Sequence, residues 1–386
     1  MSILLVFVTL IYIFLVGAMI YGWSRIPVFY LKNHSPASGF SIVIPYRNEA
    51  RNLPDLLNSL AQIKYPPSQF EIILVNDASS DSSREICEIF KQNNPQLNIH
   101  LPENFRLSGS PKKDAITTAI RFANFEYILT TDADCRVPST WLQIFNDKIA
   151  ETGAKLLAGP VKSSPFQYPA KSLRQEKGMK YFGAFQEMDF LSLQAIGAGG
   201  FGLDRAFICN GANLCYSRKA FFEVGGFTGN LEVSSGDDVF LLQKFVQKNL
   251  KTAFLKSREA IVLTKPQADL NSLISQRIRW AAKTPAYTSL FARITGLAVL
   301  LMNFILVVGF FLAFMEIIPY EPLIIAFLFK FMADLLVLYK SANFFDRKEV
   351  LRHYFWSSLV YPFYSTSIAI LSLFVKFEWK GREFKK

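Results

Sequence analysis

Two carboxylates of this sequence, Asp132 and Asp134, stand two residues apart directly after an apolar run at 127–131. The run is typical of a short buried strand, and side chains two apart in an extended segment point to the same side. Both carboxylates can therefore converge on one hard divalent cation, which prefers oxygen ligands. An Asp-x-Asp pair alone is common, so its position after a strand is what favours a metal site.

Three further carboxylates also stand where chain elements end or begin. Asp77 follows a second apolar run at 71–75, where it could accept a hydrogen bond from a ribose hydroxyl or a base N–H. A turn or helix cap is the ordinary alternative for such a residue. Asp237 and Asp238 directly precede a helical run at 239–246. One of them could act as a general base, or the pair could simply face the positive end of the helix dipole.

A fourth group consists of Gln276, Arg279 and Trp280, on an amphipathic stretch just before an apolar run. A guanidinium group is a fork of donors that suits phosphate oxygens. The same residues could instead be the basic flank of a membrane segment with its interfacial tryptophan. Taken alone, the group favours the membrane flank.

The elements that must position these groups alternate between strand and helix from residue 40 to about residue 260. Short apolar runs at 40–44, 71–75 and 127–131 each end in polar residues. Buried strands that alternate with helices predict a mainly parallel sheet in an α/β domain. The carboxyl ends of such strands share one edge, where ligands bind. We therefore expect the polar groups to meet at that edge.

The composition of the 386 residues favours a membrane protein. Hydrophobic residues make up 51% of the chain and charged residues only 19%, which excludes an intrinsically disordered chain. Apolar runs near the length of a bilayer crossing, about 20 residues, occur at 3–21, 294–315, 322–339 and 355–375. The predicted units are an N-terminal anchor over 1–23, a folded domain over 24–285, and a membrane region over 286–386 with two or three spanning helices.

The charge pattern predicts on which side of the membrane the domain lies. The net charge is +11, and the basic residues cluster beside the apolar runs, as they do in cytoplasmic flanks. We therefore expect the domain to lie in the cytoplasm and the protein to be integral to the cytoplasmic membrane. The run at 355–375 is ambiguous, because basic residues lie on both sides of it. It could be re-entrant or interfacial.

Lys330 and Asp334 lie inside the third apolar run, four residues apart and so on one face of a helix. Ionisable residues in a membrane helix are candidates for function. A mutually neutralising structural pair is the interpretation we favour.

Two other functional classes find no support in the sequence. No arginine-rich tract or basic helix indicates nucleic acid binding. The four cysteines and three histidines are too scattered to suggest a zinc site.

In order and spacing, the groups above resemble the motifs of membrane-embedded family 2 glycosyltransferases, which are inverting enzymes with a GT-A fold. The resemblance runs from Ser41 to Trp280. Its pieces are 44–49, 76–81, Lys112, the pair Asp132-x-Asp134, 210–214, 224–227, the pair Asp237-Asp238, and Gln276-x-x-Arg279-Trp280. It implies a GT-A-like, mainly parallel α/β domain in the cytoplasm with helical transmembrane segments on both sides.

The resemblance also implies a role for each group. Donor binding would fall to Pro45, Glu49, Asp77, Lys112 and Asp132. Asp134, helped by Asp132, would hold Mg²⁺ or Mn²⁺ on the donor diphosphate. Asp238 would be the catalytic base, beside Asp237, which stands where the family more often has Glu. Gln276, Arg279 and Trp280 would form the diphosphate and acceptor end of the site.

The activity implied is metal-dependent transfer of a hexosyl or N-acetylhexosaminyl group from a nucleotide sugar to a lipid or lipid-linked glycan. UDP-sugars are the commonest donors in this family. A processive polysaccharide synthase is the alternative. No clear gating loop of the cellulose synthase kind follows Trp280, and the membrane runs are mainly Phe, Leu, Ile and Val, with few groups to line a polymer channel. A non-catalytic scaffold would be expected to have lost one of the key carboxylates, and a solute transporter would need more membrane crossings.

Overall fold

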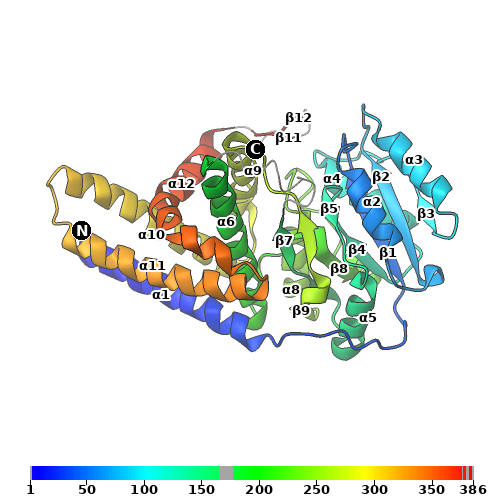
Figure 1. The fold of residues 1–386 in the computed structure, drawn as a ribbon, viewed down its shortest axis with the longest axis horizontal. Helices are drawn as coiled ribbons and strands as arrows, with labels where there is room; N and C mark the ends of the chain where they lie inside the picture. The colour runs from blue at the N-terminus through cyan, green and yellow to red at the C-terminus, as the bar shows by residue number, and fades with distance from the viewer. Residues whose placement is uncertain (1, 165–176, 376, 380–381, 385–386) are drawn as a thin grey trace.

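The chain forms an α/β domain and a group of long helices that extend away from it on one side (Figure 1). The computed structural model describes residues 2–164, 177–375, 377–379 and 382–384. Helices α1, α10 and α11 reach the end of the molecule farthest from the sheet, and α6, α9 and α12 lie between that end and the domain (Figure 1).

A seven-stranded sheet with the order β3-β2-β1-β4-β8-β6-β9 forms the centre of the domain. Strand β8 runs antiparallel to both neighbours and the other pairs are parallel, so the sheet is mainly parallel, as predicted. Tyr46 pairs with Asn76, so β1 and β2 end side by side. The strands are β1 (Phe40–Tyr46), β2 (Phe70–Asn76), β3 (Ile99–His100), β4 (Tyr127–Thr130), β6 (Leu156–Ala158), β8 (Leu214–Ser217) and β9 (Thr252–Phe254).

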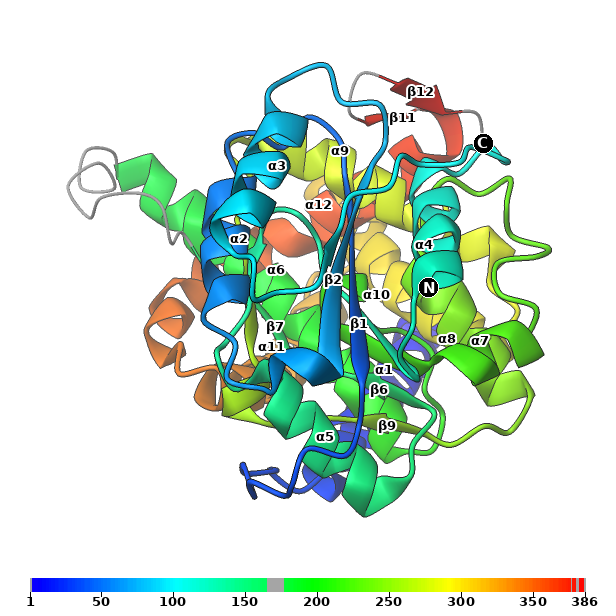
Figure 2. The same cartoon turned by 90° about the vertical axis from the view of Figure 1, so that its right-hand side faces the viewer.

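Both faces of the sheet are covered by helices, which explains why its strands read as continuous apolar runs. Ile42 and Ile44 of β1 belong to one core cluster with Leu56 of α2, and Val43 belongs to another with Ile116 of α4. Figure 2 shows α2 and α3 on one side of β1 and β2, and α4 on the other. The helices of the domain are α2 (Leu53–Ala61), α3 (Ser83–Asn93), α4 (Pro111–Phe122), α5 (Trp141–Thr152), α7 (Arg218–Glu223) and α8 (Asp237–Gln247).

A smaller three-stranded sheet connects two parts of the site. Its middle strand β10 pairs with β5, which begins directly after Asp134, and with β7. From β10 the chain continues into α9, which carries Gln276, Arg279 and Trp280. The elements concerned are β5 (Cys135–Arg136), β7 (Val161–Ser163), β10 (Val262–Thr264) and α9 (Leu270–Ala281).

Four helices of the described residues are long and apolar enough to cross a membrane, and they contain the four apolar runs almost entirely. Large apolar side chains such as Phe14, Phe314 and Phe329 are exposed on them, as expected of a lipid-facing surface. The helices are α1 (Ser2–Arg25), α10 (Leu290–Phe314), α11 (Glu321–Phe344) and α12 (Tyr354–Phe374).

The ionisable residues of α11 form the pair that their spacing predicts. Lys330 Nζ lies 2.5 Å from Asp334 Oδ2, and the other oxygen of Asp334 accepts a hydrogen bond of 2.6 Å from the hydroxyl of Tyr12 on α1. The pair therefore connects α11 to α1 within the helix group.

Helix α6 (Lys177–Gly202) is a feature that the sequence patterns did not indicate, because charged residues and glycines interrupt its apolar pattern. Its backbone lies in direct contact with the backbone of α1. A β-carbon at Gly199 would meet the backbone of Met19, and one at Gly202 would overlap the carbonyl oxygen of Gly22. Only glycine permits this approach, so α6 is packed directly against α1.

Both ends of α12 lie beside the α/β domain. Before it, Arg347 donates two hydrogen bonds to Glu187 of α6, at 2.5 and 2.8 Å. After it, the short hairpin of β11 (Phe377–Trp379) and β12 (Arg382–Phe384) brings Arg382 within 2.5 Å of Asp77. The segment before α12 is therefore bound to α6, and the segment after it is bound to the edge of the large sheet.

Candidate active site

Lys112 at the start of α4 connects two of the predicted carboxylates. Its Nζ lies 2.7 Å from Asp132 Oδ1 and 3.3 Å from Asp237 Oδ2. Burial alone would lower the pKa of Lys112, but the charges of Asp132 and Asp237 raise it above its usual value. The ammonium group is therefore held positive where the end of β4 meets the start of α8.

Asp238 is bound through both oxygens at the start of α8. Its Oδ1 accepts a hydrogen bond of 2.7 Å from Val239 N, and its Oδ2 accepts one of 3.0 Å from Gly211 N. Lys283 Nζ lies 3.7 Å from Asp238 Oδ1. Burial alone would raise the pKa of Asp238, but Lys283, Lys112 and the two backbone donors lower it below its usual value. The carboxylate is therefore kept ionised, as a base requires.

The turn before α8 requires a glycine. Gly236 has φ of +80°, a left-handed conformation that side-chain-bearing residues rarely adopt. This turn places Asp237 and Asp238 at the first positions of the helix.

Asp77 follows β2 and is surrounded by donors. Asn104 Nδ2 donates to its Oδ1 at 2.7 Å, and Arg106 lies 3.7 Å from the same oxygen. Arg382 Nη1 lies 2.5 Å from Oδ2. Arg47 donates to the carbonyl oxygen of Asp77 at 2.7 Å. Asp77 is therefore a fixed carboxylate at the edge of the sheet.

Pro45 and Glu49 lie at the end of β1 and just beyond it. Glu49 N donates a hydrogen bond of 2.8 Å to the hydroxyl of Ser83, and Glu49 Oε2 accepts one of 2.5 Å from Asn52. These contacts hold the turn after β1 against the start of α3.

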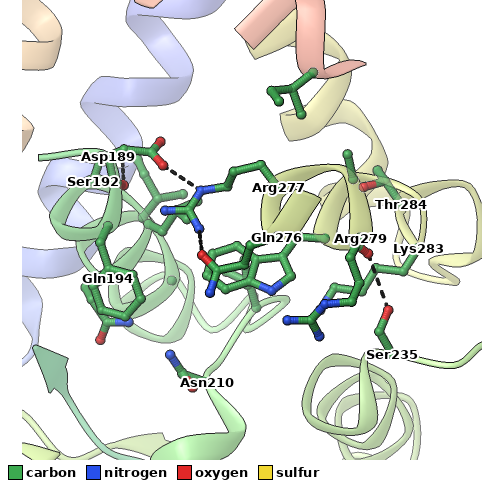
Figure 3. A pocket seen from close by; sticks show the side chains of 18 of the residues that line it. Asp189, Ser192, Gln194, Asn210, Ser235, Gln276, Arg277, Arg279, Lys283 and Thr284 are labelled. Carbon is green, nitrogen blue, oxygen red and sulfur yellow. Dashed lines mark hydrogen bonds and ion pairs between the residues drawn. The ribbon is translucent and has the colours of Figure 1, made fainter. Parts of the chain in front are cut away.

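Helix α9 starts at a capping box formed by Asp269 and Ser272, with Ser272 N donating to Asp269 Oδ1 at 2.8 Å. Near its end, Gln276, Arg279 and Trp280 line the pocket shown in Figure 3. Burial lowers the pKa of Arg279, while the four carboxylates from Asp132 to Asp238 raise it. A guanidinium group stays charged under such opposed effects.

One cavity of about 1520 Å³ brings together every residue that the sequence proposed for the site. Those residues are Pro45, Glu49, Asp77, Lys112, Asp132, Asp134, Asp237, Asp238, Gln276, Arg279 and Trp280. The cavity also continues between the long helices, where Met19, Leu301 and Leu338 line it. It therefore joins a charged pocket on the sheet edge to an apolar space inside the helix group.

The expected scarcity of polar groups in the membrane helices is wrong for α12. This helix contributes eight hydroxyl-bearing residues to the lining of the cavity: Tyr354, Ser357, Ser358, Tyr361, Tyr364, Ser365, Thr366 and Ser372. Composition alone does not show which residues of a helix line a cavity.

The carboxylates suit a metal that is bound jointly with a substrate. Asp132 and Asp134 offer the hard oxygen ligands that Mg²⁺ and Mn²⁺ take, although Asp132 Oδ1 is also paired with Lys112. Within the described part of the chain, no cluster of three or more His, Cys, Asp or Glu residues forms a complete metal site. Mg²⁺ is commonly held by one or two carboxylates together with substrate phosphates, and Asp134 fits that arrangement.

Sequence reasoning missed several neighbours of these residues. Lys283 follows the motif helix and looked like a membrane flank, yet it faces Asp238. Asn104, Arg106 and Arg382 approach Asp77 from segments with no periodic pattern. Their positions depend on the fold, so no local signal could have found them.

The arrangement of the sheet and its covering helices is a GT-A-like fold. The structure resembles that of the mannosyltransferase PcManGT from Pyrobaculum calidifontis, solved with GDP-Man and Mn²⁺, with a TM-score of 0.52. The two chains are 16% identical, and the match covers 95% of this chain and 99% of that one. At this identity the likeness concerns the fold alone.

The family follows from the sequence comparisons. The family model for glycosyl transferase family 2 matches residues 41–209, and that for glycosyl transferase family group 2 matches residues 127–375. The chain is a family 2 glycosyltransferase.

Curated relatives share parts of the chain. Glycosyltransferase AglE of Haloferax volcanii is 25% identical over 197 residues, which are 51% of this chain and 58% of AglE. Poly-β-1,6-N-acetyl-D-glucosamine synthase of Staphylococcus epidermidis is 34% identical over 101 residues, 26% of this chain and 23% of the synthase. Poly(ribitol-phosphate) β-N-acetylglucosaminyltransferase TarS of Staphylococcus aureus is 33% identical over 95 residues, 25% of this chain and 16% of TarS. The chain thus spans less than two thirds of each relative.

Proposed function

We propose that this enzyme transfers a hexosyl or N-acetylhexosaminyl group from a nucleotide sugar to a lipid-linked acceptor at the cytoplasmic face of the membrane, with inversion at the anomeric carbon. UDP-sugars are the first donors to test. The observation that carries the proposal is the single cavity that holds Asp77, Asp134 and Asp238 together with apolar side chains of α1, α10 and α11. A soluble sugar acceptor would have no use for the apolar part.

The residues of the cavity have different roles in the proposed reaction. Asp238 takes the proton of the acceptor hydroxyl, whose oxygen attacks the anomeric carbon while the bond to the diphosphate breaks. Lys112 and Arg279 face the negative charge that the departing nucleoside diphosphate carries away. A divalent cation held at Asp134 would supply further neutralisation of that charge. Asp77 and Glu49 would hold the nucleoside.

The location on the cytoplasmic face is supported by the charge pattern and by cell chemistry. Nucleotide sugars are cytosolic, so the donor pocket must open to the cytosol. The basic residues Arg25 and Arg293 lie at the C-terminal end of α1 and the N-terminal end of α10, as the positive-inside rule expects of helix ends that face the cytoplasm.

The test is to incubate the purified enzyme with labelled UDP-GlcNAc, UDP-glucose and GDP-mannose, each with Mn²⁺. Polyprenyl phosphate and polyprenyl-diphosphate-linked GlcNAc serve as acceptors. The expected product extracts into organic solvent and has one mass, or a few discrete masses. The absence of any lipid-extractable product from every pair would contradict the proposal.

A processive polysaccharide synthase stays the second candidate, because α12 lines the cavity with hydroxyl groups that a glycan could contact. The same assay separates the two. Recovery of most label as a long polymer that organic solvent does not extract would favour the synthase.

A further inference from the structure

Arg277 lies inside the Gln276-to-Trp280 motif but was given no role by it. Its side chain is only 8% exposed and lies on the side of α9 that faces α6 and α12. A buried guanidinium group needs partners for its charge and its donors. The partners that Arg277 has are the basis of the inference.

Three contacts account for this guanidinium group (Figure 3). Arg277 Nε donates to Asp189 Oδ2 of α6 at 2.6 Å, and Nη1 donates to Gln276 Oε1 at 2.5 Å. Its central carbon lies 4.2 Å from the centre of the Trp280 ring, as in a cation–π contact. Arg277, which itself lines the active-site cavity, therefore touches three other side chains that line it.

Asp189 fixes the guanidinium group in turn. Its side chain is 5% exposed, and its second oxygen accepts a hydrogen bond of 3.3 Å from Tyr361 of α12. The contact joins α6, α9 and α12 at one point. Because both charged groups are buried, neither can turn toward bulk water without losing its partner.

The geometry points to Arg277 and Asp189 as positioning residues that set the acceptor end of the site. Asp189 orients the guanidinium group, which holds the Gln276 oxygen and the Trp280 ring in place. The amide nitrogen of Gln276 and the ring of Trp280 are then directed to a molecule in the cavity. The inference rests on the proposed function in one respect: it takes that molecule to be the acceptor.

The fold provides a matched control for this pair. Glu187 lies two residues before Asp189 on α6 and forms a similar ion pair with Arg347, which precedes α12. Neither Glu187 nor Arg347 lines the cavity. Glu187→Gln therefore removes an ion pair of the same helix without touching α9.

The first experiment compares Asp189→Asn, Arg277→Lys and Glu187→Gln in the assay with polyprenyl-diphosphate-linked GlcNAc. Lysine keeps the charge but loses the flat fork that reaches Gln276 and Trp280. We expect both pair variants to lower kcat/KM for the acceptor by a factor on the order of 10². Binding of UDP and GDP with Mn²⁺, measured by calorimetry, should change less than about twofold, because Asp77 and Asp134 are unchanged in these variants. Glu187→Gln should leave both quantities near the wild type.

A second measurement does not depend on activity. The chain has five tryptophans, and fluorotryptophan labelling gives each a fluorine NMR signal, with Trp280 assigned by Trp280→Phe. Asp189→Asn should shift or broaden the Trp280 signal, and Glu187→Gln should not. The double variant Asp189→Leu, Arg277→Met removes both charges together, which keeps the fold testable, and should disturb the same signal.

The outcomes separate the two hypotheses. An unchanged Trp280 signal in the pair variants, or an equal loss of acceptor kcat/KM in Glu187→Gln, would overturn the positioning role. If the wild-type enzyme makes no lipid product while Asp189→Asn still shifts the Trp280 signal, the proposed function is overturned. The positioning of Trp280 by the pair would then still stand.

Discussion

Asp238→Asn is the most direct test of the site, because the structure shows what the carboxylate does besides catalysis. The two oxygens of Asp238 accept hydrogen bonds from Val239 N and Gly211 N at 2.7 and 3.0 Å. An amide has one accepting oxygen, so one of these backbone donors would face an NH₂ group. The change therefore removes the base and also loosens the Gly211 segment.

The two effects have different sizes and different readouts. Loss of a general base lowers kcat by about 10²- to 10⁴-fold. Loss of one hydrogen bond to a charged group lowers the free energy of unfolding by roughly 1.5–3 kcal/mol. Binding of the nucleoside diphosphate with Mn²⁺ should stay near the wild-type value, because Asp77 and Asp134 are untouched.

Asp147→Asn is the matched control for the structural effect. Asp147 is fully buried and does not line the cavity, and it also accepts through both oxygens: Oδ2 accepts a hydrogen bond of 2.8 Å from Lys32 N, and Oδ1 accepts one of 3.1 Å from His34 N. It should lose stability to a similar extent while keeping kcat. The assignment of the base is refuted if Asp238→Asn keeps kcat within about tenfold of the wild type, or if Asp147→Asn loses kcat equally.

Four further predictions follow from the structure. Removing divalent metal with EDTA should stop transfer, and Asp134→Ala should weaken nucleotide binding with Mn²⁺ but not without it; calorimetry with equal affinities in both conditions would exclude Asp134 as a ligand. Gly202→Leu should prevent α6 from packing on α1 and lower the unfolding temperature, whereas Gly17→Leu should not, since a side chain there meets nothing within 4 Å. In a chain with its native cysteines removed, Glu316→Cys in the α10–α11 loop should react with a membrane-impermeant maleimide added from outside the cell, and protection there would contradict the orientation. Arg382→Ala should lower the Kd for the nucleoside diphosphate, because the guanidinium group occupies an oxygen of Asp77; a higher Kd would show that Arg382 binds the nucleotide instead.

Much of the fold could be predicted from the sequence, because its strands are buried on both faces and so read as apolar runs. Their ends carry the turn residues and carboxylates that a parallel sheet gathers at one edge. Asp77 and Asp132 could be placed together for that reason, whereas Asp238, at the start of α8, was linked to them only by the family resemblance. The first three apolar membrane runs were also predicted within a few residues of α1, α10 and α11.

The rest depends on contacts between distant segments, which leave no periodic signal. Arg277 and Asp189 are 88 positions apart, and Asp77 and Arg382 are 305 apart. Helix α6 could not be predicted because it contains several glycines, which weaken a helix in isolation. In the structure, two of these glycines allow the backbone of α1 to approach closely. The hydroxyl groups that α12 contributes to the cavity could not be predicted, because composition does not tell which residues of a helix line a cavity.

The contact of glycine backbones between α1 and α6 has a consequence for what the enzyme can reach. A catalytic domain tethered by a flexible linker could tilt and sample hydroxyls over a range of heights. Here α6 is packed directly on α1, which would hold Asp238 at one level above a bilayer that α1 crosses. The enzyme would then select acceptors by the height of their reacting hydroxyl above the membrane as well as by their chemistry. A glycan whose terminal hydroxyl stands above or below that height would not react.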